Sequence, residues 1–258
     1  MKRRELFVAA DGTTQYRPKD LKHKLNLNYL DLTNKSQLSE RLELPELHCD
    51  TDVYPDFLAL FSEPGEYHRT KRTAVCTFEY DDVFDGQHGL ANAIYYRNKR
   101  DIAKFEKRFA GVHFFISPDI SLLGDVDVIE NLNRIKRARI TSLWLSLKMH
   151  AVVIPLITYP NIEYMDIVLN GLEQCTVVAF STKGFIKNAE ERVALKEAIR
   201  ITVDRLPLKA IVIYDVCADC YEVYDIFDYA IRKGVKLIIP PNTLQIRNRR
   251  RKDGDENA

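Results

Sequence analysis

From residue 74 onward, short apolar runs alternate with longer segments in which apolar residues recur at helical spacing. No other feature limits the fold as strongly. Each run is short enough for a strand, and several are apolar at consecutive positions, as in strands covered on both faces. The predicted strands are AVCTFEY (74–80), VHFFI (112–116), VVIPLI (152–157), TVVAF (176–180), AIVIY (210–214) and VKLII (235–239).

Five segments with helical periodicity lie between these runs, over residues 99–109, 126–150, 162–170, 189–205 and 222–233. Gly111, Gly171 and Gly234 fall just past the ends of three of them, where a left-handed C-cap is expected. Strand and helix in alternation give right-handed crossovers and a mostly parallel sheet. The sequence therefore predicts an α/β fold, either an open doubly wound sheet or an incomplete TIM-like barrel, because local pattern does not encode strand order. Pro155, inside the third run, favours an edge position or a bulge there.

The two ends of the chain differ from this rhythmic part. Residues 1–73 lack a clear period, and we interpret them as an irregular N-terminal extension packed on the main domain through residues such as Phe57 and Leu58. The α/β domain is predicted over residues 74–246. The remaining RNRRRKDGDENA, residues 247–258, is basic, then acidic, with no apolar residue except Ala258, and predicts a disordered charged tail.

Composition excludes several classes of protein. A hydrophobic fraction of 46% and a charged fraction of 29% are ordinary for a globular protein. The net charge of +1 provides no global field for nucleic acid or anionic membranes. No apolar run approaches the roughly 20 residues of a membrane span, and the start MKRRELFVAADG lacks a signal-peptide core. Five scattered cysteines fit reduced thiols, so we predict a cytoplasmic protein that does not bind membranes.

Polar residues follow each predicted strand. In parallel α/β folds, ligands bind where the carboxyl ends of the strands open into loops, so these residues define the rim of a site. The alternative for any single position is a solvated turn, since every strand must end in something polar. Catalytic roles are predicted for Asp82, Asp119, Ser181 and Lys183. Ligand-binding roles are predicted for Asp81, Ser117, Thr158, Thr182 and Asp215.

The predicted helix starts argue against a phosphate ligand. N-caps are predicted at Asn98, Asp125, Asn161, Asn188 and Asp219, and acidic residues occupy the first turns that follow. Helix N-termini attract anions when they are free, but these are filled by the protein's own carboxylates. The turn STKG (181–184) follows a strand as an anion loop would, yet it lacks the G-x-x-x-x-G-K-[ST] pattern.

Acidic rim groups suit a divalent cation, a proton-transfer step or a polyhydroxylated ligand. Asp81, Asp82 and Asp119 could share a hard metal ion through oxygen ligands, and His88 could join them if its loop folds inward. Alternatively, one carboxylate acts as a general base and Lys183 as an electrostatic stabiliser. The C-x-x-C pair Cys217 and Cys220 lacks the second pair of a structural zinc site, and incidental thiols are the simpler interpretation.

A competing hypothesis uses the basic segments. The predicted helix 126–150 carries Arg134, Lys136, Arg137 and Arg139, and the tail contains RNRRRK. A nucleic-acid-associated accessory protein would use both, although a solvated helix face explains the first equally well. A third hypothesis is a protein-binding module whose rim is merely solvated.

The order of several segments carries a family resemblance. FEYDD, HFFISPDIS, an Arg-rich helix reaching a Trp, VIPLITY and VAFSTKG together resemble domain of unknown function 4417, an uncharacterised bacterial and phage family, over roughly residues 74–245. The positions carried over are Asp81, Asp82, Ser117, Asp119, Ser181 and Thr182. Asn170 departs from the resemblance, which implies an acidic residue before Gly171. The resemblance implies a bacterial or mobile-element origin and a role in element maintenance or host conflict, but no particular reaction.

Overall fold

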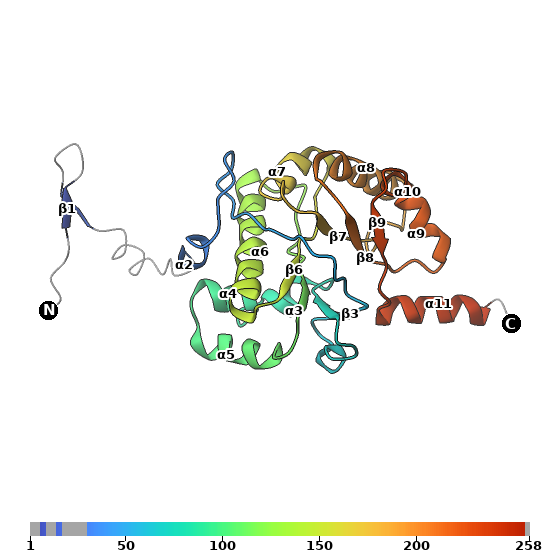
Figure 1. The fold of residues 1–258 in the computed structure, drawn as a ribbon, viewed down its shortest axis with the longest axis horizontal. Helices are drawn as coiled ribbons and strands as arrows, with labels where there is room; N and C mark the ends of the chain where they lie inside the picture. Colours follow the sequence, from blue (N-terminus) through green and yellow to red (C-terminus); the bar gives the residue numbers. More distant parts are fainter. Residues whose placement is uncertain (1–5, 9–13, 17–29, 256–258) are drawn as a thin grey trace.

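A computed structural model describes residues 6–8, 14–16 and 30–255 of the chain. The first two segments, β1 (Leu6–Val8) and β2 (Thr14–Tyr16), form an antiparallel pair that lies apart from the main body (Figure 1). Residues 30–56, from α2 (Leu30–Thr33) onward, lead into the first strand of the main body. The remainder of the predicted N-terminal extension, residues 1–5, 9–13 and 17–29, lies outside the described residues, as does 256–258.

The main body contains two all-parallel sheets, which confirms the predicted α/β class. Their strand orders are β3-β4-β5-β6 and β7-β8-β9, so every strand pairs with its neighbours in the chain. The strands are β3 (Phe57–Leu60), β4 (Thr73–Cys76), β5 (Phe114–Ile116), β6 (Val152–Ile154), β7 (Val177–Ser181), β8 (Ala210–Tyr214) and β9 (Lys236–Ile238). Neither sheet shows the reversal of strand order that an open doubly wound sheet requires.

Isolated parallel bridges join the two sheets on both sides. Leu156 pairs with Ala179, where the Ala179 N–H donates to the Pro155 carbonyl at 2.7 Å. Leu58 pairs with Asn242, where the Leu58 N–H donates to the Pro241 carbonyl at 3.0 Å. The strand pairing therefore closes on β3, as in the predicted TIM-like barrel. The closure after β6 and after β9 consists of one isolated bridge each.

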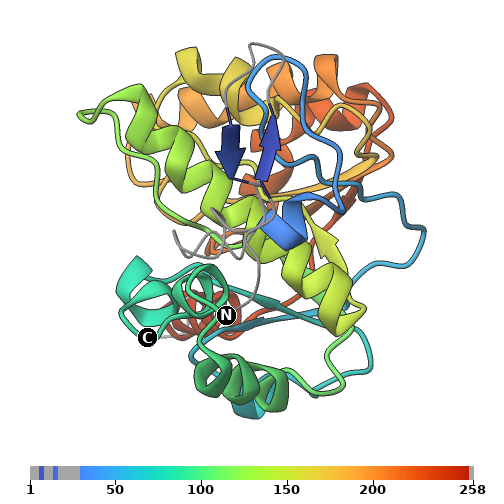
Figure 2. The ribbon, with the colours of Figure 1, turned by 90° about the vertical axis from the view of Figure 1, so that its left-hand side faces the viewer.

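Helices surround these strands (Figure 1). In Figure 2 the long helix α6 lies between green helices below it and orange helices above it. The longer helices are α5 (Lys99–Arg108), α6 (Val128–Met149), α8 (Ala189–Arg205) and α11 (Thr243–Asp255). The short helices are η1 (Pro64–Glu66), α3 (Asp81–Asp85), α4 (Leu90–Tyr95), η2 (Ile162–Tyr164), α7 (Met165–Leu169), α9 (Cys220–Ile226) and α10 (Asp228–Arg232).

Alternate residues of the first sheet enter two separate apolar cores. Leu58, Cys76 and Ile154 belong to the larger core, which also contains β7, β8 and the helices that cover them. Phe57 and Val75 point the other way, into a core with α4, α5 and α6. Both faces of these strands are therefore covered, which explains the runs of consecutive apolar residues.

The predicted domain boundary at residue 74 is too late. Phe57–Leu60 forms β3 and pairs along its full length with β4, so the first strand of the barrel comes from the segment interpreted as an irregular extension. Two short helices over residues 81–95 are also absent from the prediction. Both differences involve elements too short to show a period.

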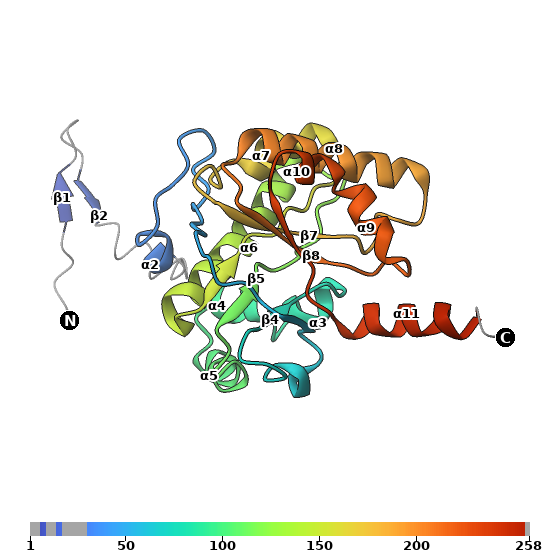
Figure 3. The same ribbon diagram turned by 45° about the vertical axis from the view of Figure 1, so that its right-hand side comes forward.

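The described part of the predicted charged tail is helical. Residues 247–255 belong to α11, which runs outward from the end of β9 (Figure 3). The side chain of Asn242, the residue before this helix, accepts the Gln245 N–H at 2.9 Å, which is a helix-capping bond. Arg249 pairs with a buried aspartate of the barrel, described below, so part of the basic cluster is anchored instead of frayed.

Most predicted helix ends are confirmed. Gly111, Gly171 and Gly234 all adopt positive φ angles, near +80°. Asn98, Asn188 and Asp219 cap their helices through side-chain hydrogen bonds. One predicted cap is wrong, since Asp127 caps α6 in place of Asp125. Asn161 occupies the predicted N-cap position of η2 but makes no side-chain capping bond. Among the described residues, no helix is long and apolar enough to cross a membrane.

Candidate functional site

Asp119 is the centre of the candidate site, at the carboxyl ends of three neighbouring strands. Ser117 and Pro118 follow β5 directly, and the chain then turns so that the Asp119 N–H donates to the Thr77 hydroxyl at 2.7 Å. Thr77 follows β4, and Thr158, which hydrogen-bonds the Asp119 carboxyl, lies beyond β6. The parallel order of these strands brings together groups that are 81 residues apart (158 − 77).

The carboxyl group of Asp119 has an unusual electrostatic environment. Burial raises its pKa to about 7, and the negative charge of Asp81 acts in the same direction. The Thr158 hydrogen bond and the positive charge of Lys183 oppose this shift without cancelling it. A carboxyl group with a pKa near neutrality can both give and take a proton under physiological conditions.

Lys183 and Asp81 act on the Asp119 carboxyl with opposite charges. The Lys183 ammonium donates to the Phe78 carbonyl, which holds this residue of the β7 rim beside the β4 rim. Asp81 is held by the Arg134 guanidinium at 3.1 Å and by the Ser121 hydroxyl at 3.0 Å. Asp81 therefore already has a positive partner, whereas the positive charge that acts on Asp119 comes from Lys183.

Three other predicted positions serve the backbone or face solvent. The Ser117 hydroxyl accepts the Leu156 N–H at 2.7 Å, just after Pro155 interrupts the ladder. The Ser181 hydroxyl accepts the Lys183 N–H at 3.0 Å and so closes the turn after β7. Asp82 is exposed on α3, and the charges that shift the pKa of Asp119 do not include it. Only part of the predicted site is therefore brought together in the structure. The residues that lie close to one another are Asp119, Lys183, Thr158 and Asp81.

Asp215 and Thr182 form a second, separate cluster, buried under α11. Asp215 has no exposed surface, and its Oδ2 accepts hydrogen bonds from Gln245 at 2.7 Å and Arg249 at 3.0 Å. Thr182 accepts the Val216 N–H at 2.9 Å. In this structure Asp215 anchors the C-terminal helix, and the Thr182 hydroxyl contacts Asp215 at 3.4 Å. Sequence reasoning missed Gln245 and Arg249 because no local pattern links them to residue 215.

Two buried phenols near the rim have unused hydrogen-bonding capacity. The hydroxyls of Tyr159 and Tyr214 are buried and have no hydrogen-bond partner among the described residues. The Tyr159 ring stacks on Phe185 at 5.4 Å, and the Tyr214 ring lies 4.4 Å from Phe78. Burial raises the pKa of both phenols, so both stay protonated and can donate.

Comparison with known proteins identifies the family. The model of a family described as Domain of unknown function (DUF4417) matches residues 36–230. The chain belongs to this family. No curated protein and no solved structure shows significant similarity to the chain.

The DUF4417 match covers the candidate site but not all of the barrel. It begins earlier than the resemblance predicts, so it includes β3, and it ends before β9 and α11. Asp81, Asp119 and Lys183 lie within the matched range. The Gln245 and Arg249 partners of Asp215 lie outside it. The α11 anchor therefore stands apart from the segment that the family model describes.

A resident metal ion has little support at this rim. Over the described residues, no group of three or more His, Cys, Asp or Glu side chains could hold a metal ion. His88, the predicted additional ligand, contacts Asp101 at 3.1 Å instead. Cys217 is buried while Cys220 is exposed, and both thiols are free.

The arginines of α6 are engaged within the protein. Arg134 pairs with Asp81 and Glu130, and Arg137 pairs with Asp85 at 2.7 Å. Arg139 is buried and donates to four backbone carbonyls. Apart from Glu130, four residues before Arg134 on the same helix, these partners lie far away in the chain or on the backbone, so the sequence does not show them.

We expect Arg249→Met to lower the free energy of unfolding by about 2 kcal/mol. Removing one partner of a buried ion pair costs about 3–5 kcal/mol, and the lower value reflects an Arg249 side chain that is 36% exposed. Urea unfolding measures the change. Arg247→Met, an exposed position on the same helix, is the matched control with an expected loss within about 0.5 kcal/mol. Equal losses in the two variants would show that the anchor contributes nothing.

Proposed function

We propose that the protein binds a small polar molecule at the carboxyl ends of β4, β5 and β6, and that Asp119 exchanges a proton with it. The observation that carries this proposal is the position of Asp119, a partly buried carboxyl group on the rim with a pKa near 7. This function is that of an acid–base enzyme or of a binding protein that recognises a protonatable ligand.

Each neighbouring group has a defined part in this proposal. Asp119 is the general acid or base, because its pKa lies near the working pH. Lys183 stabilises negative charge that develops on the ligand when a proton leaves it. The Thr158 hydroxyl, which hydrogen-bonds the Asp119 carboxyl, orients that group toward the ligand.

The charges at the rim favour a neutral hydroxyl-bearing or carbonyl-bearing ligand. Asp81 is already paired with Arg134, so a divalent cation would have to displace a guanidinium before it could bind two carboxylates. The cavity that reaches Thr158 has a volume of about 30 Å³, which is room for about one water molecule. The ligand would therefore approach Asp119 from the open rim.

The test uses a panel of sugars, polyols and hydroxy ketones, screened by saturation-transfer NMR. We expect compounds that bind the wild type to bind Asp119→Asn about tenfold more weakly, the loss of about one charge-assisted hydrogen bond. Asp82→Asn is the matched control, since it neutralises an exposed carboxyl on the same rim. The proposal fails if Asp119→Asn and Asp82→Asn bind the panel equally well, or if Mg²⁺ alone binds and both variants abolish its binding.

The nucleic-acid hypothesis is not carried forward as a second function. It needs free basic side chains on α6, and Arg134, Arg137 and Arg139 have internal partners. The bacterial or mobile-element origin implied by the resemblance stays a prediction, as does a role in maintaining such an element. A cytoplasmic location also stays a prediction.

A further inference from the structure

A second cavity lies at the opposite end of the strands from Asp119. It has a volume of about 360 Å³ and lies between the loop that precedes β4 and the turn that precedes β5. Tyr67 and Val112 supply buried walls, and Gly111, with a φ of +78°, forms part of its edge. This volume lies within the range of small-molecule sites, about 300–1,000 Å³.

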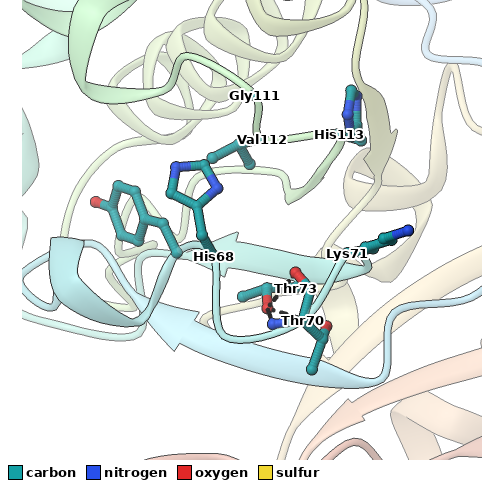
Figure 4. Close-up of a pocket in the computed structure, with 8 residues that line it drawn as sticks. His68, Thr70, Lys71, Thr73, Gly111, Val112 and His113 are labelled. Carbon is teal, nitrogen blue, oxygen red and sulfur yellow. Dashed lines mark hydrogen bonds between the residues drawn. The ribbon is translucent and has the colours of Figure 1, made fainter.

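The polar side chains around this cavity are basic or neutral. His68, Lys71 and His113 line it, together with Thr70 and Thr73. Figure 4 shows His68 facing the turn at Gly111, with Lys71 and His113 on the other side of the hollow. All three basic side chains are exposed, and no Asp or Glu lines the cavity. One ammonium and two imidazoles around a hollow without carboxylates are suited to an anion.

Two carboxylates that contact this loop or belong to it have positive partners. Asp56 pairs with Arg72 at 3.1 Å and also accepts the Thr70 hydroxyl. Glu66 pairs with Arg69 at 3.0 Å. Neither carboxylate therefore neutralises Lys71 or the two histidines.

We propose that this cavity binds a small molecule through a tetrahedral oxyanion, a phosphate or sulfate group, held by Lys71, His68 and His113. The apolar walls formed by Val112 and the Tyr67 ring contact the remainder of the ligand. The Tyr67 hydroxyl itself is used elsewhere, because it donates to the Phe61 carbonyl at 2.6 Å. This site is independent of the proposed function, since Asp119 lies at the other end of the strands.

The experiment titrates the full chain with inorganic phosphate and with sulfate at constant ionic strength, with chloride as the reference anion. Two-dimensional ¹H–¹³C NMR follows the imidazole signals of His68 and His113. We expect a saturable shift of both rings with phosphate and sulfate, and an apparent Kd about tenfold weaker in Lys71→Gln, the loss of one charged contact. His48→Gln, a histidine outside the cavity, is expected to leave the Kd unchanged.

Calorimetry with phenyl phosphate and phenol separates recognition of the oxyanion from recognition of the apolar part of the ligand. Phenyl phosphate is expected to bind more tightly than inorganic phosphate, and phenol is expected to show no binding. The proposal is overturned if neither oxyanion perturbs the two rings saturably, or if Lys71→Gln binds as the wild type does. A pair of rings that responds to Zn²⁺ and not to phosphate would also overturn it, because it would identify a metal site. Asp119→Asn should not alter any of these results.

Discussion

Arg139→Met is expected to lower the free energy of unfolding by about 3–5 kcal/mol, the cost of leaving about two buried carbonyls without a donor. Arg139 is 4% exposed, and its guanidinium donates to the carbonyls of Pro45, Val168, Asn170 and Gly171 at 2.9–3.2 Å. Methionine fills a similar volume but has no donor. Several buried carbonyls would then lose a partner, at about 1–3 kcal/mol each where no other donor replaces Arg139.

The position of these carbonyls explains why one side chain has such a large expected effect. The carboxyl end of α7 and the two residues after it supply three of these carbonyls, those of Val168, Asn170 and Gly171. The last carbonyls of a helix accept no hydrogen bond from within the helix. Pro45 belongs to the segment that leads into β3. Arg139 thus joins α6, α7 and the N-terminal segment of the described chain. Burial lowers its pKa to about 10, which leaves it charged near neutral pH.

Urea unfolding of three variants tests this role. Arg200→Met is the matched control on α8, where Arg200 pairs with Glu197 and Asp204 in an exposed network. We expect a loss below about 1 kcal/mol there. Arg139→Lys should fall between the two, since an ammonium lacks the planar fork that reaches four acceptors. Equal losses for Arg139→Met and Arg200→Met would contradict the prediction.

The six strands from residue 74 onward could be predicted because their covered faces leave a continuous apolar pattern. Val177–Ser181 and Ala210–Tyr214 are buried along their whole length, so VVAF and AIVIY stand out in the sequence. The strand FLAL at residues 57–60 is equally apolar but sits between prolines in a stretch without a period. Its identity depends on pairing with β4, which local sequence does not encode.

The position of the site could be predicted from the sequence. The interactions of each residue in it could not. Asp119 and Asp215 both follow a buried strand, and the sequence assigns both to one rim. Their surroundings differ because α11 brings Arg249 to Asp215, while Lys183 reaches the neighbourhood of Asp119 and bonds a backbone carbonyl. Long-range partners decide whether a carboxylate is neutralised, and a single sequence contains no direct signal for them.

Asp119→Asn is expected to make the protein more stable at pH 8, by up to about 4 kcal/mol. The pKa of Asp119 rises from an ordinary 3.8 to about 7 in the folded protein. The folded state therefore binds more protons than the unfolded chain between pH 4 and 7, so the free energy of unfolding falls as the pH rises through this window. Each pKa unit corresponds to about 1.4 kcal/mol, and partial exposure of Asp119 reduces the effect toward about 2 kcal/mol.

Urea unfolding at pH 4 and at pH 8 measures this difference. The stabilisation by Asp119→Asn should be near zero at pH 4, where the wild-type carboxyl is protonated in the folded state, and should be complete at pH 8. Asp82→Asn is the control for loss of an exposed carboxylate and should show no such pH dependence. If Asp119→Asn instead destabilises the protein more at pH 8 than at pH 4, the folded state stabilises the carboxylate and its pKa is lowered.

The stability and the ligand binding of Asp119→Asn, taken together, show whether Asp119 is a structural or a functional carboxyl group. A structural carboxylate, such as Asp215 with its buried partners, is expected to reduce stability when it is removed. Asp119 has no arginine partner of this kind among the described residues, and its charge is costly above pH 7. A residue that lowers stability is retained where function requires it. Asp119→Asn should therefore gain stability at pH 8 and lose ligand binding in the same preparation.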